Sequence, residues 1–188
     1  WPDPTEAIER GRELRAAGAD FLDVGGESTR PGSQRVAPEE EWRRIRDVIE
    51  TLAGEGHPIS VDTINATTAQ QALAAGARII NDVSGGEADP RMAAVIAEHE
   101  VPFVVTHWRG DPRIMNTLAR YTNVAVEVRD ELARQVEKVL AAGVRPEHII
   151  IDPGLGFAKD GEDDWGVLGH LEGLAALGGP LSVGSAVA

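Results

Sequence analysis

The chain has 188 residues, of which 42% are hydrophobic, and this is typical of one folded domain with its own apolar core. It carries 31 acidic and 18 basic residues, so its formal net charge is −13. Because nucleic acids and anionic membrane surfaces bind basic patches, this balance argues against both as partners. The sequence contains no cysteine, which excludes disulfides and thiolate metal sites, and no apolar run approaches the roughly 18 residues of a membrane span.

Apolar runs typical of buried strands alternate with segments of helical periodicity along the whole sequence. Caps and glycines bound the predicted helices, and Thr5 is the expected N-cap of the first one. The helices span about residues 5–17, 38–53, 66–75, 92–99, 123–142 and 165–177. The predicted strands lie between them, at residues 21–24, 59–62, 78–83, 101–107, 149–152 and 181–183. Strict alternation of this kind predicts parallel strands with right-handed crossovers.

Two segments repeat the same local pattern, which supports this order of elements. Residues 16–23 match residues 74–81, and each contains a helix end, a glycine and an apolar strand. An open doubly wound sheet and a (β/α)8 barrel both fit such units. The sequence shows no G-x-G-x-x-G after its first strand, which disfavours dinucleotide binding. We expect residues 1–188 to form a single incomplete barrel domain with about six of eight βα units, the others lying before Trp1 and after Ala188.

The stretch 21–32 joins an apolar run to a loop rich in glycine, hydroxyl groups and arginine. Its apolar part predicts a buried strand, and Gly25 and Gly26 permit a turn or a close approach to a ligand. Thr29 and Arg30 offer donors suited to a phosphate group or a carboxylate. Such a loop at the end of a buried strand is where α/β proteins place their sites.

Three predicted strands end in polar residues with oxygen acceptors, namely Asp62, Asn81 and Asp152. The carboxyl ends of parallel strands meet at one edge, so we expect these side chains to share a pocket that binds an N–H-rich edge, such as that of a pterin. An alternative for Asp152 is the N-cap of a following helix with Pro153 at its first position. Phe157 would stack on a flat ring or plug the barrel mouth, and Lys159 would contact a ligand or only solvent.

Other polar residues favour structural interpretations. The five histidines do not show metal-ligand spacing, and His107 is most simply a structural histidine at a strand end. We expect Met92 and Trp42 to lie in the core. A further set is expected to form a solvated helix face: Glu127, Arg129, Asp130, Glu131, Arg134, Glu137 and Lys138.

Five segments together resemble the dihydropteroate synthase family, whose members are pterin-binding barrel enzymes, and their details look most like actinobacterial members. In order along the chain, these segments are Asp23–Gly32, Ser60–Thr63, Ile80–Gly86, His107–Arg109 and Ile151–Lys159. The resemblance implies a (β/α)8 barrel, a homodimer and a cytoplasmic enzyme. It also implies transfer of a dihydropterin-methyl group from its pyrophosphate to 4-aminobenzoate, with Mg²⁺.

The resemblance also implies roles for individual residues. Asp62, Asp152 and Arg30 would be catalytic, and Asp62, Asn81 and Asp152 would bind the pterin edge. The other expected substrate-binding residues are Thr29, Pro31, Thr106, Phe157 and Gly184. No metal ligand is expected in this chain, because the family's Mg²⁺-binding asparagine lies on a strand that would precede Trp1.

The sequence departs from the family pattern in places that bear on activity. Thr106 stands where the family usually has a methionine, and Ser185–Ala188 stand where it has a conserved lysine. We therefore expect these 188 residues alone to bind pterin weakly and not to turn over. Two alternatives remain, a non-catalytic pterin-binding relative and a methyltetrahydrofolate-type methyltransferase barrel.

Overall fold

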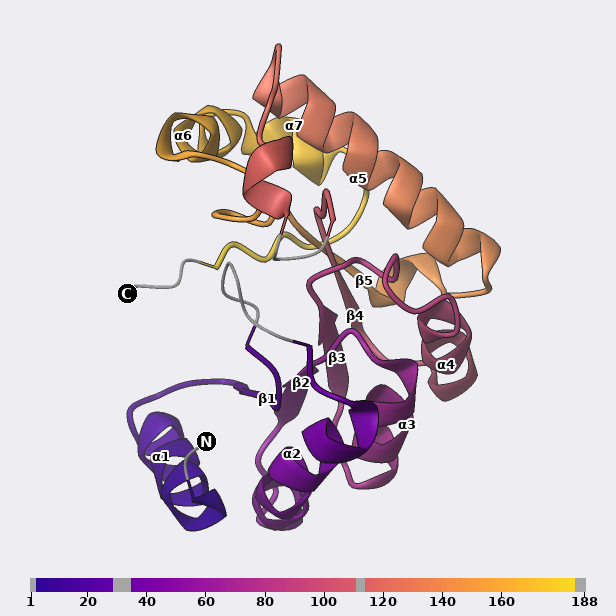
Figure 1. The fold of residues 1–188 in the computed structure, drawn as a ribbon. Coiled ribbons are helices and arrows are strands. Elements are labelled where there is room, and N and C mark those ends of the chain that lie inside the picture. The colour runs from indigo at the N-terminus through magenta and orange to yellow at the C-terminus, as the bar shows by residue number, and fades with distance from the viewer. Residues whose placement is uncertain (1–2, 29–34, 111–113, 185–188) are drawn as a thin grey trace.

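In the computed structural model, residues 3–28, 35–110 and 114–184 are described, and they form an α/β fold (Figure 1). The strands are β1 (Leu22–Gly25), β2 (Ile59–Asp62), β3 (Ile79–Asp82), β4 (Phe103–Thr106) and β5 (Ile149–Asp152). The helices are α1 (Pro4–Ala16), α2 (Pro38–Gly54), α3 (Ala66–Ala74), α4 (Met92–His99), α5 (Val124–Ala141), α6 (Gly161–Leu168) and α7 (Leu171–Ala175). Two short 3-10 helices, η1 (Met115–Leu118) and η2 (Pro146–His148), complete the list.

The five strands form one parallel sheet in the order β1-β2-β3-β4-β5. Each strand therefore pairs with the next one along the chain, whereas a doubly wound sheet reverses its strand order at a switch point. This sequential order is that of a barrel wall, and it decides between the two folds that the sequence left open.

The run predicted as a sixth strand contributes only a single parallel bridge, between Leu181 and Ile151. The Ile151 N–H donates to the Pro180 carbonyl at 2.9 Å, and the Ser182 N–H donates to the Ile151 carbonyl at 2.8 Å. Pro180 has no N–H of its own to extend the ladder. The prediction of a full strand at residues 181–183 is therefore wrong, although its place beside β5 is right.

One face of the sheet packs on the helices and forms the core. Side chains alternate between the two faces of a strand, and those on the helix-covered face are fully or almost fully buried. They are Leu22, Ile59, Val61, Ile80, Phe103, Val105, Ile149 and Ile151. Helices α2 and α5 complete this core with apolar stripes, and Met92 on α4 is buried as expected, whereas Trp42 is only partly buried.

Three boundaries differ from the sequence-based prediction. The side chain of Asp3, not Thr5, caps α1, because its carboxylate accepts a hydrogen bond from the Thr5 N–H at 2.7 Å. Phe21 precedes β1 and is 54% exposed, so it is not part of a buried strand. The helix predicted at residues 165–177 is two helices, α6 and α7, separated by Gly169 and His170.

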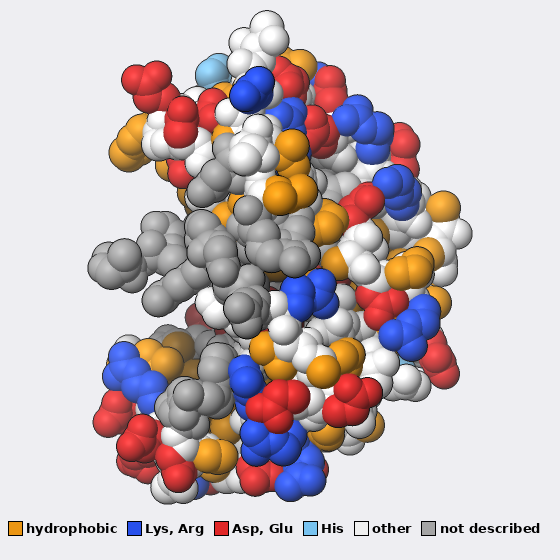
Figure 2. Space-filling model, viewed as in Figure 1, with side chains coloured by type: hydrophobic (Ala, Val, Ile, Leu, Met, Phe, Trp, Pro, Cys, Tyr) orange, Lys and Arg blue, Asp and Glu red, His pale blue; other side chains and the backbone are white. Residues whose placement is uncertain are grey.

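The visible surface carries acidic and basic side chains that are interspersed (Figure 2). Many of them form ion pairs within one helix, such as Arg43 with Glu40 at 2.6 Å on α2. Exposed pairs of this kind contribute little to stability. Among the helices that the structure describes, none is long and apolar enough to cross a membrane.

Candidate functional site

Four neighbouring strands each carry a polar candidate residue at the C-terminal end. These residues are Asp62 on β2, Asn81 on β3, Thr106 on β4 and Asp152 on β5. Asp62 lies opposite Asn81 in the strand register, and Thr106 lies opposite Asp152. Their chain neighbours on each strand point into the helix-packed core, so by alternation the four face away from it. The structure thus brings together, on one face and at one edge, the three acceptors predicted from the strand ends.

Asp62 carries a buried carboxylate oxygen that lacks a partner. Its Oδ1 makes no hydrogen bond within the part of the chain that the structure describes. Burial raises the pKa of Asp62 well above its usual value, and the nearby charges of Asp23 and Asp82 raise it further. An unpaired buried acceptor of this kind is costly to the fold and suits a ligand that donates a hydrogen bond.

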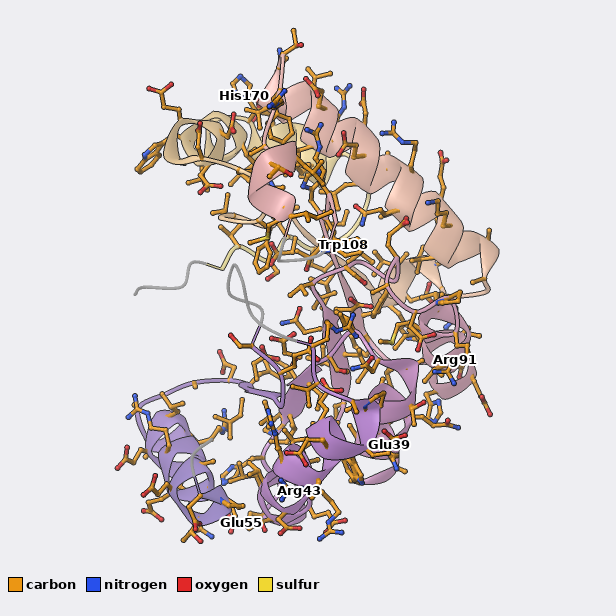
Figure 3. The ribbon with its side chains drawn as sticks, viewed as in Figure 1. Glu39, Arg43, Glu55, Arg91, Trp108 and His170 are labelled. Atoms are coloured by element: carbon orange, nitrogen blue, oxygen red, sulfur yellow. The ribbon has the colours of Figure 1, made fainter. Side chains whose placement is uncertain are left out.

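A small pocket opens beside Asp62, between the ends of β1 to β4. It is lined by Glu27, Ser28, Glu41, Asp62, Thr63, Ile64, Val83 and Trp108. Trp108 follows β4 and is labelled near the centre of the view in Figure 3, whereas Arg91, the N-cap of α4, is labelled toward its side. Asn81, Thr106 and Asp152 share the edge with Asp62 but do not line this pocket.

Asn81 makes a polar contact toward β1. Its Nδ2 donates a hydrogen bond to Oδ2 of Asp23 at 3.1 Å. Asp23 is exposed, so this contact extends the polar edge from β3 across to β1. The amide oxygen of Asn81 is the acceptor that we assigned to a ligand edge, and the Asp23 contact fixes the orientation of the amide that presents it.

Asp152 is engaged on both carboxylate oxygens. Oδ1 accepts a hydrogen bond from the Gly154 N–H at 2.7 Å, and Oδ2 accepts one from the Ser182 hydroxyl at 2.8 Å. Burial raises the pKa of Asp152, and these hydrogen bonds oppose that shift. The alternative interpretation of Asp152 as a helix cap is wrong, because the next helix, α6, begins at Gly161 and has Asp160 as its N-cap.

The remaining predicted residues lie in several places. Phe157 is partly buried in the turn that follows β5, and Thr106 is buried at the end of β4. Gly184 is exposed beyond the single bridge at Leu181. Thr29 and Arg30 were predicted to hold an anion and Pro31 to bind substrate, and all three lie outside the described residues.

A polar cluster that the sequence analysis missed lies beneath the pocket. Glu41 is fully buried, and its Oε2 accepts hydrogen bonds from Asn65 at 2.8 Å and Thr68 at 2.5 Å. Asn65 in turn accepts a hydrogen bond from Arg35, which forms an ion pair with Glu27 at 2.9 Å. Acidic residues in the first turn of α2 suit the helix dipole, and this local pattern gives no sign of these long-range partners.

The cluster also explains one glycine of the stretch 21–32. A Cβ at Gly26 would lie 2.7 Å from the backbone oxygen of Glu41, closer than real Cβ contacts come. Gly26 therefore allows β1 and α2 to approach each other, rather than making room for a ligand.

A second cluster lies beyond β4, and it corrects the prediction of a solvated face on α5 at Glu127 and Glu131, whereas Arg134, Glu137 and Lys138 are exposed as expected. Glu131 accepts hydrogen bonds from Nε2 of His107 at 2.9 Å and from Nη2 of Arg109 at 2.6 Å. Arg109 also pairs with Glu127 at 3.0 Å and lies 3.8 Å over the ring of Tyr121. Glu131 and Glu127 therefore connect α5 to the loop after β4 through their ion pairs with Arg109.

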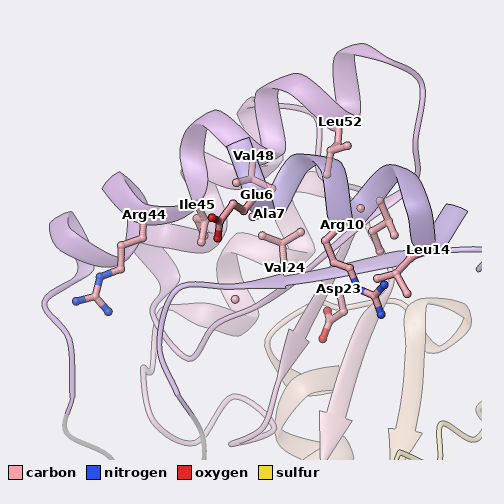
Figure 4. Close-up of a pocket in the computed structure, with 13 residues that line it drawn as sticks. Glu6, Ala7, Arg10, Leu14, Asp23, Val24, Arg44, Ile45, Val48 and Leu52 are labelled. Carbon is pink, nitrogen blue, oxygen red and sulfur yellow. The ribbon is translucent and has the colours of Figure 1, made fainter. Parts of the chain in front are cut away.

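A groove larger than the small pocket beside Asp62 lies elsewhere, between α1, β1 and α2 (Figure 4). Its lining is mainly apolar and includes Leu14, Val24, Ile45, Val48 and Leu52. It follows the outer edge of β1 and includes none of the predicted site residues. In a closed barrel each strand edge pairs with another strand, and this groove lies along such an edge. We therefore interpret it as part of the barrel wall and not as the candidate site.

Comparisons with known proteins agree with this geometry. The family described as pterin binding enzyme matches residues 2–186. Dihydropteroate synthase from Mycobacterium leprae is 46% identical, over 97% of this chain and 65% of that protein. The Xanthomonas albilineans dihydropteroate synthase with 4-aminobenzoic acid superposes with a TM-score of 0.89 at 38% identity, over 96% of this chain and 64% of that one. The Thermus thermophilus dihydropteroate synthase in complex with 6HMPPP superposes with a TM-score of 0.81 at 41% identity. This match covers 94% of this chain and 66% of that one.

The chain spans only part of the length of the relatives it matches. It spans 65% of the Mycobacterium leprae protein and 62% of the one from Synechocystis. The resemblance inferred from five short segments is thus confirmed over nearly the whole chain, and the barrel fold with it. The family match, together with the acceptors at the strand ends, shows that the chain belongs to the family of pterin binding enzymes.

Proposed function

We propose that this chain is the pterin-binding part of a dihydropteroate synthase. The reaction joins 6-hydroxymethyl-7,8-dihydropterin pyrophosphate to 4-aminobenzoate and releases pyrophosphate. The observation that carries the proposal is the row of acceptors at the ends of β2, β3 and β5, with the unpartnered Oδ1 of Asp62 among them. Solved relatives that bind 6HMPPP, 4-aminobenzoic acid and 7,8-dihydropteroate support this choice of substrates and product.

The acceptors suit both the ligand and the charge that develops on it. A pterin presents N–H donors along one edge, which Asp62, Asn81 and Asp152 would accept. As pyrophosphate leaves, positive charge develops on the methylene carbon and spreads into the ring. Carboxylates already bonded to the ring stabilise that charge more than they stabilise the neutral substrate, which lowers the barrier.

Other residues take their proposed roles from the family resemblance. Thr29 would contact the pterin pyrophosphate substrate, and Pro31 would bind substrate beside Arg30. Arg30 would stabilise the negative charge of the pyrophosphate as it leaves. Phe157 would contact the substrate at the turn after β5, and Thr106 and Gly184 would also contact the substrate. The aryl amine then only has to be placed in line with the methylene carbon.

Mg²⁺, the dimer and a cytoplasmic location are proposals of the same kind. Among residues 3–28, 35–110 and 114–184, no group of three or more His, Cys, Asp or Glu side chains could hold a metal ion. The described residues thus do not fit a Mg²⁺ site of their own, and we assign none of them a metal-dependent step. A homodimer and a cytoplasmic location follow only from the family resemblance.

The test of the proposal is release of pyrophosphate in the full-length protein that contains this chain. We expect pyrophosphate and dihydropteroate to form in equal amounts when both substrates are present, and neither to form when 4-aminobenzoate is omitted. The same assay on residues 1–188 alone would show whether these residues turn over. Binding of the dihydropterin pyrophosphate without dihydropteroate formation would contradict the proposal and favour a non-catalytic relative.

Asp152→Asn is expected to weaken pterin binding about tenfold to a hundredfold, because a hydrogen bond to a charged acceptor contributes roughly 1.5–3 kcal/mol. The fold should tolerate the change. The asparagine oxygen can still accept from the Gly154 N–H, and its amide can donate to the Ser182 hydroxyl. Calorimetric titration with 6-hydroxymethylpterin monophosphate measures the first effect and urea unfolding the second. An unchanged affinity would show that Asp152 serves only the turn after β5.

A further inference from the structure

Lys159 is a buried cation with all of its donors in use. Its side chain follows the turn after β5, and the residue is 7% exposed. Nζ makes three hydrogen bonds, to Nδ1 of His107 at 2.9 Å, to the Gly154 carbonyl at 2.9 Å and to the Phe157 carbonyl at 3.0 Å. An ammonium group has three donors, so this one has none left for a ligand. The expectation that Lys159 contacts a ligand or only solvent is therefore not met.

The contact with Lys159 fixes the tautomer of His107. Because Nζ donates to Nδ1, that nitrogen carries no proton, and the ring proton lies on Nε2. Nε2 then donates to Oε2 of Glu131 at 2.9 Å. His107 is fully buried, and burial lowers its pKa to about 4, so the ring is neutral near pH 7. The imidazole thus acts as an acceptor on one side and a donor on the other.

The turn that Lys159 holds is also the turn that carries Phe157 and meets Asp152. The Gly154 carbonyl accepts the Phe157 N–H at 3.0 Å, and the Gly154 N–H donates to Asp152 at 2.7 Å. Ala158, which follows Phe157, has φ of 50°. This left-handed conformation costs a residue with a Cβ about 1 kcal/mol. The Ala158 carbonyl accepts from the Tyr121 hydroxyl at 2.9 Å, so the turn is held from both sides.

We infer that Lys159, held by the neutral Nε2–H form of His107, is a positioning residue that sets Phe157 and Asp152 for the pterin ring. It ties together the two carbonyls at the ends of the turn, and through Gly154 it fixes the oxygen of Asp152. The inference rests on the proposed function, because it concerns the same candidate site at the ends of the strands. It adds a link from the loop after β4 to the loop after β5 that does not touch the ligand.

A matched pair of variants separates positioning from simple packing. In His107→Asn, the short amide places its oxygen near Nδ1, so the acceptor for Lys159 remains and the bond to Glu131 is lost. In His107→Gln, the longer amide reaches Glu131 and leaves Lys159 without its acceptor. Both variants lose the ring, so a merely structural role predicts similar behaviour. We expect the Gln variant to bind 6-hydroxymethylpterin monophosphate about tenfold more weakly than the Asn variant, since tenfold corresponds to one ordinary hydrogen bond.

Lys159→Met provides the second measurement, because methionine keeps the apolar stem and removes all three donors. We expect its pterin affinity to fall at least as far as that of the Gln variant in the full-length protein. In the unliganded protein, we expect the Phe157 amide to exchange with solvent about tenfold faster in Lys159→Met and His107→Gln than in His107→Asn. Urea unfolding of each variant confirms that the measurements are made on folded protein.

The two readouts also keep this inference apart from the proposed function. If the wild-type protein binds no pterin, the proposed function fails, while amide exchange still tests how the turn is held. If the wild type binds pterin but the Asn and Gln variants lose affinity equally, the positioning role is wrong and the proposed function stands. Wild-type affinity and wild-type exchange in Lys159→Met would overturn the inference outright.

Discussion

Asp62→Asn is expected to make the fold more stable and the pterin site almost empty. The variant replaces a carboxylate whose buried Oδ1 has no partner among the described residues. An unsatisfied buried polar group costs about 1–3 kcal/mol, so its removal should raise the free energy of unfolding by that amount at neutral pH. The NH2 group of the new amide lies near the carboxylates of Asp23, Glu27 and Glu41, which can accept its hydrogen bonds. Pterin affinity should fall about a hundredfold, because the charged acceptor is lost.

The stability gain should depend on pH with a definite sign. Burial raises the pKa of Asp62 in the folded state, so the folded protein binds a proton that the unfolded chain has already released. The wild type therefore loses stability as pH rises from about 4, the usual value, up to the raised pKa. Below about pH 4 both states are protonated, and the advantage of asparagine should vanish.

Urea unfolding at pH 3.5 and pH 7.5, with calorimetric titration of the pterin monophosphate, measures both effects. Asp20→Asn is the matched control, because Asp20 is an exposed carboxylate that precedes β1. Its stability should change by less than about 0.5 kcal/mol, as for most surface substitutions. A loss of stability in Asp62→Asn at pH 7.5 would mean that the ionised carboxylate is already well paired in the free protein.

The order of the elements could be predicted because local chemistry alone specifies it. Gly18 and Gly76 lie between the helix and the strand of the two repeated segments. They adopt φ of 104° and 108°, which other residues rarely do. The apolar run of β5 was assigned with its observed boundaries, since an unbroken apolar run before Asp152 is typical of a buried parallel strand. The break between α6 and α7 could not be found, because glycine within a helical pattern is a weak signal.

The candidate site was predictable only as far as the strand ends. Parallel strands must bring their last residues to one edge, so Asp62, Asn81 and Asp152 could be grouped without coordinates. The partners of His107 could not be found in this way. Lys159 lies 52 residues further along the chain, and no spacing rule connects two such positions. Glu131 has the helical spacing of a solvated face, and only the tertiary structure supplies its partners.

Arg109→Met is expected to cost about 3 kcal/mol of stability, the largest loss among the substitutions considered. Arg109 binds Glu131 in a bidentate manner, from Nε at 2.9 Å and from Nη2 at 2.6 Å. It also pairs with Glu127 and donates from Nη1 to the backbone carbonyl of Arg120 at 2.9 Å. Burial acts to raise the pKa of Glu131, but hydrogen bonds from His107 and Arg109 outweigh it and lower the pKa to about 2.

Removing Arg109 therefore leaves Glu131 ionised and without its main partner. Breaking a buried ion pair from one side costs about 3–5 kcal/mol, and the 24% exposure of the Glu131 side chain places this case at the lower end. Arg109→Lys should recover only part of the loss, since lysine lacks the planar fork that binds both oxygens. Urea unfolding measures the loss, with Arg43→Met as control, because the Arg43 side chain is 72% exposed and pairs with Glu40 along α2. Equal losses in Arg109→Met and Arg43→Met would show that the contacts beyond β4 contribute no more than a surface ion pair.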